Sequence, residues 1–360
     1  MPDITFKMTA ATNVGLVRTN NEDNFIVNPD LTSSDWLVPK DPEVVISLGK
    51  NGCVMVVADG MGGMNAGEVA SDLAIKGIRK SFGDVTDFSK ITDTPGHIET
   101  FMKKAIVSAD SDIKKKVKDD PSTEGMGTTI VVAWILENVV HVAWCGDSRA
   151  YLFNRQSGLS RLSRDHSYVQ QLVDSGKLDP ELAFDHPNSN IITRSLGDSN
   201  TVAQPDYVSK GLSSGDMILL CSDGLCGLIR DEEIVDILTP ERATLNEYRD
   251  ALFTGALDAG GHDNITIALL ECVTVREPEL ERTLSATVKP RAKKSRAWIW
   301  ILVLLLLAGG VYAAWQTGLI DKALDMIPRH VDQVPQTEIT AEESAPADAD
   351  AGSEIELNNE

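Results

Sequence analysis

Short apolar runs separated by polar turns fill the first 274 residues, and most have the length of buried strands. The run from residue 128 to 163, "TTIVVAWILENVVHVAWCGDSRAYLFNRQSGLSRLS", predicts a meander of strands with turns at Glu137-Asn138 and at "NRQSG" from Asn154. Short connections of this kind join antiparallel neighbours. Both faces of these strands are apolar, so we expect both faces to be covered by other parts of the chain.

Two further runs, "DMILLCSDG" and "NITIALLECV", predict additional buried strands, whereas "KDPEVVISLGKNG" indicates an extension of a strand connection. Residues 97–120 carry apolar side chains at spacings of three and four, which is typical of a helix with one buried face. Residues 66–80 and 241–259 predict two more helices, the last ended by Gly260-Gly261. Strands with helices bunched between them favour an α+β layered sandwich, and residues 1–274 are predicted to form one domain.

A different pattern follows this domain. The segment "AWIWILVLLLLAGGVYAAWQTGLI", residues 297–320, contains no charged residue, and about 20 apolar residues suffice for a helix to cross a bilayer. Its aromatic residues near both ends favour the membrane interface. We therefore predict a transmembrane helix at residues 297–318, a basic linker at 275–296 and an acidic, disordered tail at 319–360.

Charge on either side of this segment predicts its orientation. Residues 289–296 carry five cations, whereas residues 319–360 carry eleven acids and two bases. Because cationic flanks stay on the cytoplasmic side, the large domain is predicted to be cytoplasmic and the tail external. The N-terminus lacks the charged-then-apolar pattern of a signal peptide, so we expect none.

The composition narrows the function classes. The formal net charge is −21; removing −9 for the tail and +5 for the basic stretch leaves −17 for residues 1–288. An acidic domain of this kind argues against nucleic-acid binding, which needs a cationic surface. The five cysteines are scattered through apolar segments and predict reduced core residues of a cytosolic domain.

Acidic residues stand where the predicted strands meet their loops. Any one of them alone would be interpreted as a turn residue, but several strands share the feature. If the sandwich gathers these ends, the anions would crowd into one cleft and repel each other unless a cation neutralises them. The residues concerned are Glu22, Asp23, Asp59, Asp147, Asp223 and Asp263.

Oxygen ligands of this type favour Mg²⁺ or Mn²⁺. Zn²⁺ is less favoured, because the six histidines lie far apart and no cysteine–histidine pair has zinc spacing. Glycines follow Asp59 at Gly60 and Gly62-Gly63, where they permit close approach of an ion, water and backbone.

The motifs "GLVRTNNED", "VVADGMGG", "GEVAS", "GMGTT", "CGDSR", "RDHSYVQQLVDSGKL", "IITRSLGD", "LLCSDGL" and "GGHDNIT" occur in this order over residues 10–270. Through these motifs the chain resembles the metal-dependent type 2C serine/threonine protein phosphatases, in particular the bacterial branch that opposes serine/threonine kinases. The resemblance implies an α-β-β-α sandwich of two antiparallel sheets flanked by helices. It also implies two catalytic Mn²⁺ or Mg²⁺ ions, with a third in bacterial relatives.

The resemblance assigns a role to each matching residue. It implies that Asp59 bridges the two catalytic metals, that the Gly60 carbonyl binds the second, and that Asp223 and Asp263 hold the first. Other positions follow from the same comparison: Glu22 and Asp23 act on the second metal through water, Asp147 with Asp223 forms a third site, and Arg18 grips the substrate phosphate.

The predicted function is hydrolysis of phosphoserine and phosphothreonine in proteins by a water activated between two metals, reversing bacterial serine/threonine kinase signalling. Predicted partners are phosphorylated proteins, including a cognate kinase, and membrane lipid at residues 297–318. The predicted location is the bacterial inner membrane, in a single pass with the catalytic domain in the cytoplasm.

Three alternative functions fit the sequence less well. A catalytically idle phosphoprotein-binding module on the same fold is disfavoured, because an idle site has no need to keep clustered anions. A calcineurin-like metallophosphoesterase would need histidine ligands that we do not find. A cysteine-nucleophile phosphatase is disfavoured by the spacing of Cys145 to Arg149 and of Cys221 to Arg230.

Some positions depart from the family pattern. Asn13 stands where relatives usually have Asp, and a small effect on hydrogen bonding near the site is expected. Met61 occupies the place of a proposed general acid, a histidine in some eukaryotic relatives, so the proton donor stays open. His166 and His186 are candidates, although structural roles are favoured for both. Residues 165–192 resemble the flap beside the metal site, a candidate element for substrate selection.

Overall fold

The structure is a computed structural model of the chain, and it describes residues 4–37, 43–62 and 66–275. Contacts divide the chain into two units, Met1–Leu284 and Ser285–Glu360. Within the described residues no helix is both long and apolar enough to span a membrane. The predicted transmembrane helix at 297–318 lies outside them, as do most of the predicted linker and the whole acidic tail, so these stay predictions.

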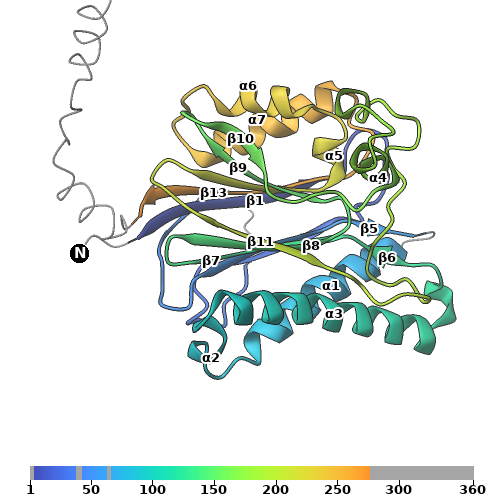
Figure 1. The fold of residues 1–360 in the computed structure, drawn as a ribbon, viewed down its shortest axis with the longest axis horizontal. Coiled ribbons are helices and arrows are strands. Elements are labelled where there is room, and N and C mark those ends of the chain that lie inside the picture. Colours follow the sequence, from blue (N-terminus) through green and yellow to red (C-terminus); the bar gives the residue numbers. More distant parts are fainter. Residues whose placement is uncertain (1–3, 38–42, 63–65, 276–360) are drawn as a thin grey trace, which may run out of the picture. The chain divides into compact units, whose positions relative to one another are not determined.

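Two antiparallel sheets form the centre of the domain (Figure 1). The six-stranded sheet has the order β10 (Gly158–Arg161), β9 (Arg149–Asn154), β12 (Met217–Cys221), β13 (Ile265–Thr274), β1 (Thr5–Asn13) and β3 (Val44–Ser47). The five-stranded sheet has the order β11 (Asp206–Gly211), β8 (Val139–Cys145), β7 (Ile130–Leu136), β4 (Cys53–Ala58) and β2 (Asn24–Asn28). A two-stranded ribbon joins β5 (Gly60–Met61) to β6 (Gly127–Thr128).

Helices cover the outer face of each sheet (Figure 1). The five-stranded sheet packs on α1 (Ala66–Gly83) and α3 (Pro95–Asp119), with the short α2 (Ser89–Thr92) nearby. The six-stranded sheet packs on α6 (Asp231–Leu238) and α7 (Leu245–Asp258). The remaining helices are α4 (Tyr168–Asp174), α5 (Asp223–Cys226), η1 (Pro121–Thr123) and η2 (Pro180–Leu182). The α-β-β-α sandwich is thus confirmed.

Alternation along the central strands explains these layers. In β4, Val54 and Val56 pack in the cluster shared with α1 and α3, whereas Met55 and Val57 pack between the two sheets. All six residues of β4 are buried. Both faces of such a strand are apolar because both are covered, and each buried side chain of this size stabilises the fold by about 1.5–3 kcal/mol.

The structure corrects three predictions. The run from Val139 to Asn154 is not one part of a continuous meander, because β8 lies in one sheet and β9 in the other; the chain crosses between them at Gly146, which has a φ of 123°. Residues 44–47 form the edge strand β3 beside β1 and not a mere connection. Helix α7 begins at Leu245, because Thr244 caps it by accepting a hydrogen bond from the Glu247 N–H.

Candidate metal centre

The loops that carry the predicted site residues meet at one end of the sandwich. β13 starts at Ile265, antiparallel to β12, which ends at Cys221. In the other sheet the first residue of β2, Asn24, lies opposite the last residue of β4, Ala58. Antiparallel neighbours reverse direction, so the segments just after Ala58 and Cys221 emerge beside those just before Asn24 and Ile265. Acids that are distant in sequence therefore converge.

Asp59, Asp147 and Asp223 lie close enough for their charges to interact. Burial raises the pKa of Asp59 well above its usual range, and the charges of Asp223, Asp23 and Asp147 raise it further. The pKa of Asp147 is also raised well above its usual range, by burial first and then by Asp223. The side chains of Asp59 and Asp223 act directly on each other: Asp223 raises the pKa of Asp59, whereas Asp59 opposes the rise that burial causes at Asp223. The sequence predicted this repulsion between acidic side chains gathered at the strand ends.

Asp23 is held rigidly inside this cluster. Its Oδ2 accepts hydrogen bonds from Ser222 Oγ and Thr266 Oγ1, both at 2.7 Å. Burial raises the pKa of Asp23 to about 8, although the two hydroxyl groups act in the opposite direction. These hydroxyls tie the segment before β2 to the six-stranded sheet. Sequence reasoning missed both of them; the only local signal was the position of Ser222 directly before Asp223.

Arg18 and Asp263 form an ion pair at the outer side of the cluster. Arg18 Nη2 donates to Asp263 Oδ2 at 2.7 Å, with 52% of the Arg18 side chain exposed. Arg18 also interacts with the charges of Glu22 and Asp223, and the pKa of Arg18 is raised, first by Asp263. Burial raises the pKa of Glu22, although the charge of Arg18 acts in the opposite direction. The predicted phosphate-binding arginine therefore stands among the predicted metal ligands.

The backbone packs closely around Gly60. A Cβ at Gly60 would lie 2.2 Å from the Gly67 carbonyl oxygen and 2.5 Å from that of Glu22. A Cβ at Gly67 would in turn lie 2.8 Å from Glu22 Oε2. Three chain segments meet here at distances that only glycine allows, and the Ser71 hydroxyl fixes one of them by donating to the Glu22 carbonyl at 2.7 Å.

Two threonines of the "GMGTT" motif fix the backbone of Asp59. Its carbonyl oxygen accepts from Thr129 N–H and from Thr128 Oγ1, each at 2.8 Å, and its own N–H donates to Thr129 Oγ1. Thr129 Oγ1 also lies 2.6 Å from Ser148 Oγ, next to Asp147. These contacts give the motif a physical role: it orients two candidate ligands relative to each other.

Asn264 fixes the backbone of the loop that carries Arg18. Its side-chain amide donates to the carbonyl oxygens of Val14 and Asn20, and its Oδ1 accepts from Glu22 N–H at 2.8 Å. The loop that carries Arg18 is therefore fastened to the residue that follows Asp263.

The candidate metal ligands at this end of the domain all offer oxygen atoms, which suits Mn²⁺ or Mg²⁺. Burial first, and then mutual repulsion, raise the pKa values of Asp59 and Asp147, and a divalent cation would offset both effects. Among the residues that the structure describes, no three acidic, histidine or cysteine side chains already enclose a point closely enough to hold an ion. The residues fit the ions by the chemistry of their oxygen atoms.

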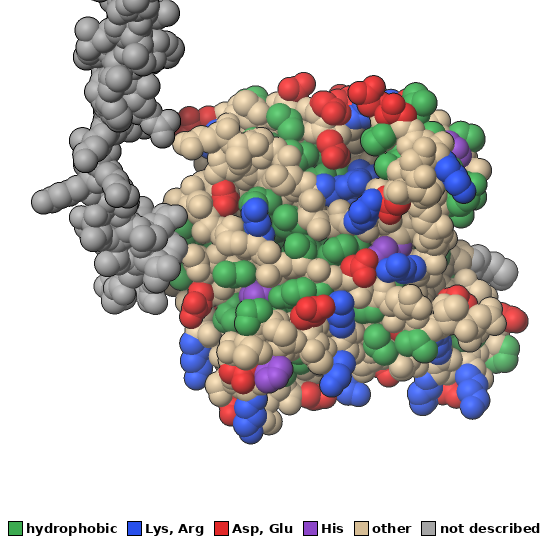
Figure 2. Space-filling view, viewed as in Figure 1, with side chains coloured by type: hydrophobic (Ala, Val, Ile, Leu, Met, Phe, Trp, Pro, Cys, Tyr) green, Lys and Arg blue, Asp and Glu red, His purple; other side chains and the backbone are tan. Residues whose placement is uncertain are grey.

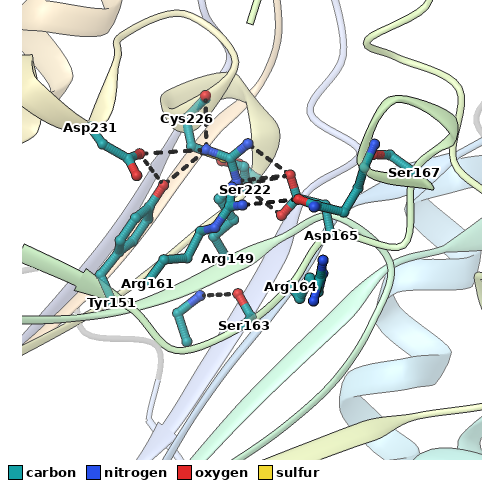
Figure 3. Close-up of polar contacts among 12 residues, drawn as sticks. Arg149, Tyr151, Arg161, Ser163, Arg164, Asp165, Ser167, Ser222, Cys226 and Asp231 are labelled. Atoms are coloured by element: carbon teal, nitrogen blue, oxygen red, sulfur yellow. Dashed lines mark hydrogen bonds and ion pairs between the residues drawn. The ribbon is translucent and has the colours of Figure 1, made fainter. Parts of the chain in front are cut away.

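Beside the carboxylates lies a buried network centred on Arg149 (Figure 3). Arg149 Nε and Nη2 donate to the Asp165 carboxylate, the shortest bond being 2.7 Å. Its Nη1 donates to Tyr151 Oη at 3.0 Å, and Tyr151 Oη donates to Asp231 at 2.8 Å. Arg149 thus joins β9, the start of the flap segment 165–192 and the first turn of α6. Sequence reasoning did not identify this network.

His166 belongs to the framework. Its Nδ1 accepts from Gly146 N–H at 3.1 Å, which leaves Nε2–H to donate to Asp206 Oδ2 at 3.0 Å. Burial lowers the pKa of His166. Both ring nitrogens are engaged, so the favoured structural role fits these contacts. His186 Nδ1 accepts from Asn188 N–H within the flap segment.

The two departures from the family pattern have local contacts. Asn13 Oδ1 accepts from Gly15 N–H at 2.8 Å, so this side chain shapes the turn before Arg18. Met61 packs near Gly127 across the small ribbon of β5 and β6. A thioether carries no titratable proton, so Met61 cannot be the proton donor.

Comparisons with known proteins agree with this geometry. A family profile described as "Protein phosphatase 2C" matches residues 41–257. The chain is 37% identical over 218 residues to the serine/threonine phosphatase stp of Listeria monocytogenes, covering 61% of this chain and 84% of the relative. It is 35% identical over 278 residues to the protein phosphatase PhpP of Streptococcus pneumoniae, covering 76% and 100%.

A solved structure is similar as well. The catalytic domain of the serine/threonine protein phosphatase PstP, in complex with two manganese ions, shares 30% identity with this chain at a TM-score of 0.58. The match covers 75% of this chain and 99% of that one.

Proposed function

The chain belongs to the protein phosphatase 2C family and is a serine/threonine protein phosphatase that uses Mn²⁺ or Mg²⁺; from this premise we propose how its own residues carry the reaction. The observation that supports the proposal most strongly is the convergence of Asp59, Asp223 and Asp263 with Arg18 at one end of the sandwich. The catalytically idle alternative is not supported, because the relatives named above are phosphatases.

Each candidate ligand has a proposed place. Asp59 would be shared by two ions, the Gly60 carbonyl would bind one of them, and Asp223 with Asp263 would bind the other. Glu22 and Asp23 would act on the ions through water, since Asp23 Oδ2 already accepts two hydrogen bonds from the protein. Asp147, 9% exposed and near Asp223, would serve a third ion. When bound, such ions supply charge stabilisation to phosphoryl oxygens and lower the pKa of water.

The protein's own groups orient the phosphoryl group. Arg18 uses Nη2 for Asp263, and its half-exposed guanidinium is proposed to donate its other N–H groups to the phosphate oxygens. No side-chain nucleophile is required: the cysteines are buried, and burial raises the pKa of the Cys145 thiol to about 12, which disfavours the reactive thiolate.

Arg18→Ala is expected to lower kcat/KM for a phosphothreonine peptide by about 10- to 100-fold, since a hydrogen bond to a charged group contributes roughly 1.5–3 kcal/mol. Most of the change should appear in KM, with Arg18→Lys intermediate because lysine keeps the charge but not the fork. The measurement is steady-state kinetics with Mn²⁺, with Arg79→Ala, an exposed arginine on α1, as the matched control. A kcat/KM for Arg18→Ala equal to that of the control would contradict the proposed role.

We also propose that residues 297–318 anchor the enzyme to the inner membrane, with the catalytic domain in the cytoplasm beside the kinases whose action it reverses. The support is the uncharged segment with its cationic flank. After cell fractionation and an alkaline wash, the full chain should stay with the membranes, whereas a 1–288 fragment should be soluble. Recovery of the full chain in the soluble fraction would refute the anchor.

A further inference from the structure

A cleft of about 490 Å³ leads away from the candidate metal centre. Asp147 and Asp223 lie at its lining, together with residues of α4, η2, α5 and the first turn of α6. This volume is within the range of about 300–1,000 Å³ that ligand sites occupy. A phosphorylated side chain held at the metal centre would therefore have its neighbouring residues at the entrance of the cleft.

The cations of the cleft are already paired with carboxylates of the protein. Arg149 binds Asp165, and Arg161 Nη1 lies 3.5 Å from the same carboxylate. Arg230 pairs with Asp185 at 2.5 Å and lies 4.2 Å from the ring centroid of Phe184. These arginines hold the flap segment against α5 and α6, and their charges are largely neutralised.

Two acids of the cleft differ in this respect. Glu181 on η2 and Glu232 on α6 are exposed, and the described residues provide neither side chain with an ion pair or hydrogen bond. They belong to different elements of the lining, Glu181 to the flap segment and Glu232 to the helix after α5. Figure 2 shows acidic side chains along the rim formed by α6, above arginines and lysines that lie lower on the same face.

The lining of the cleft is also partly apolar. Val169, Val173 and Leu228 line the cleft, as does Phe184. Lysine and arginine bury their aliphatic stems on apolar surface while the charged end stays near water and acids. A cleft with apolar walls and unpaired carboxylates at its rim therefore suits a cationic side chain, whereas it would repel an acidic one.

We infer that this cleft binds the residues flanking the phosphorylated serine or threonine and selects substrates with lysine or arginine beside the phosphorylation site, with Glu181 and Glu232 as the residues that determine the charge preference. The inference rests on the proposed function of the neighbouring metal centre.

The test uses phosphothreonine peptides that differ only at the second and third positions on either side of the phosphothreonine, which are Lys, Ala or Glu. With the purified full chain and Mn²⁺, kcat/KM should be about 10-fold higher for the Lys peptide than for the Glu peptide, as two partly screened charge pairs would give. Added salt should reduce this ratio. In Glu181→Gln/Glu232→Gln the ratio should fall to about 2 or less.

Glu241→Gln, an exposed acid on the loop after α6, is the matched control and should keep the wild-type ratio. If the two glutamates only stabilised the ends of their helices, the double variant would melt earlier but keep its Lys-to-Glu ratio, and the inference would be overturned. Equal rates for all peptides with the wild-type protein, or a preference for the Glu peptide, would overturn it too. Failure of the proposed function looks different, because then neither the peptides nor p-nitrophenyl phosphate would be hydrolysed.

Discussion

Asp223→Asn is expected to lower kcat/KM for a phosphothreonine peptide by at least about 1,000-fold, because this residue is a proposed ligand of two ion sites and its charge cannot be replaced by an amide. In the structure the charge of Asp223 acts on Asp59, Asp147 and Arg18. Removing this one charge should weaken ion binding at both sites that Asp223 is proposed to share. The measurement is steady-state kinetics at saturating Mn²⁺, with Mn²⁺ affinity from calorimetry.

The matched control is Asp236→Asn, the same chemical change at an exposed position of α6, which should leave kcat/KM within a factor of about two. The metal-free melting temperature separates catalysis from folding. Asp223→Asn removes repulsion from a crowded cluster and should melt no earlier than the wild-type protein without metal. A rate close to that of the control would show that Asp223 is not a ligand.

Chelation should abolish activity completely. A fragment of residues 1–288, which includes the compact unit Met1–Leu284, is expected to release phosphate from phosphothreonine peptides only in the presence of Mn²⁺ or Mg²⁺. The physical reason is that the site needs a cation. When none is bound, the buried carboxyl groups of Asp59, Asp147 and Asp223 repel each other and their pKa values stay raised. Mn²⁺ added back should restore the rate and raise the melting temperature, since an ion that binds only the folded state stabilises it.

EDTA saturated beforehand with Mn²⁺ is the control, because it retains the chelator but not its capacity to remove metal. Activity that survives excess free EDTA would contradict both the proposed ligand set and the reaction derived from it. Inhibition by the metal-saturated chelator would instead show that EDTA blocks the site directly.

The orientation of the site depends on contacts between segments very far apart in sequence. Arg18 and Asp263 are separated by 245 residues, and the Thr266 hydroxyl that holds Asp23 is separated from it by 243. Ser222 and Asp23 are separated by 199 residues. A substitution in β13 or in the loop before β2 should therefore disturb the metal centre without touching an ion directly.

Much of the fold could be predicted from local patterns. The apolar runs identified β4, β7, β12 and β13, the spacing of three and four identified α3, and the acids at strand ends identified the candidate ligands. Helix α6 and the short α4 were not predicted, because they have only eight and seven residues and their packing partners lie in other segments.

By itself, then, the sequence determined most of the central strands, the long helices and which acids stand at the strand ends, because periodicity, caps and turns are properties of neighbouring residues. Only the tertiary structure decided which strands share a sheet, as when β8 and β9 separate at Gly146. It also decided that Ser222 and Thr266 hold Asp23, that Arg149 joins the flap segment to α6, and that Glu181 and Glu232 line one cleft. Such contacts follow from strand register and layer packing. These bring together residues whose local sequences do not indicate that they will be in contact.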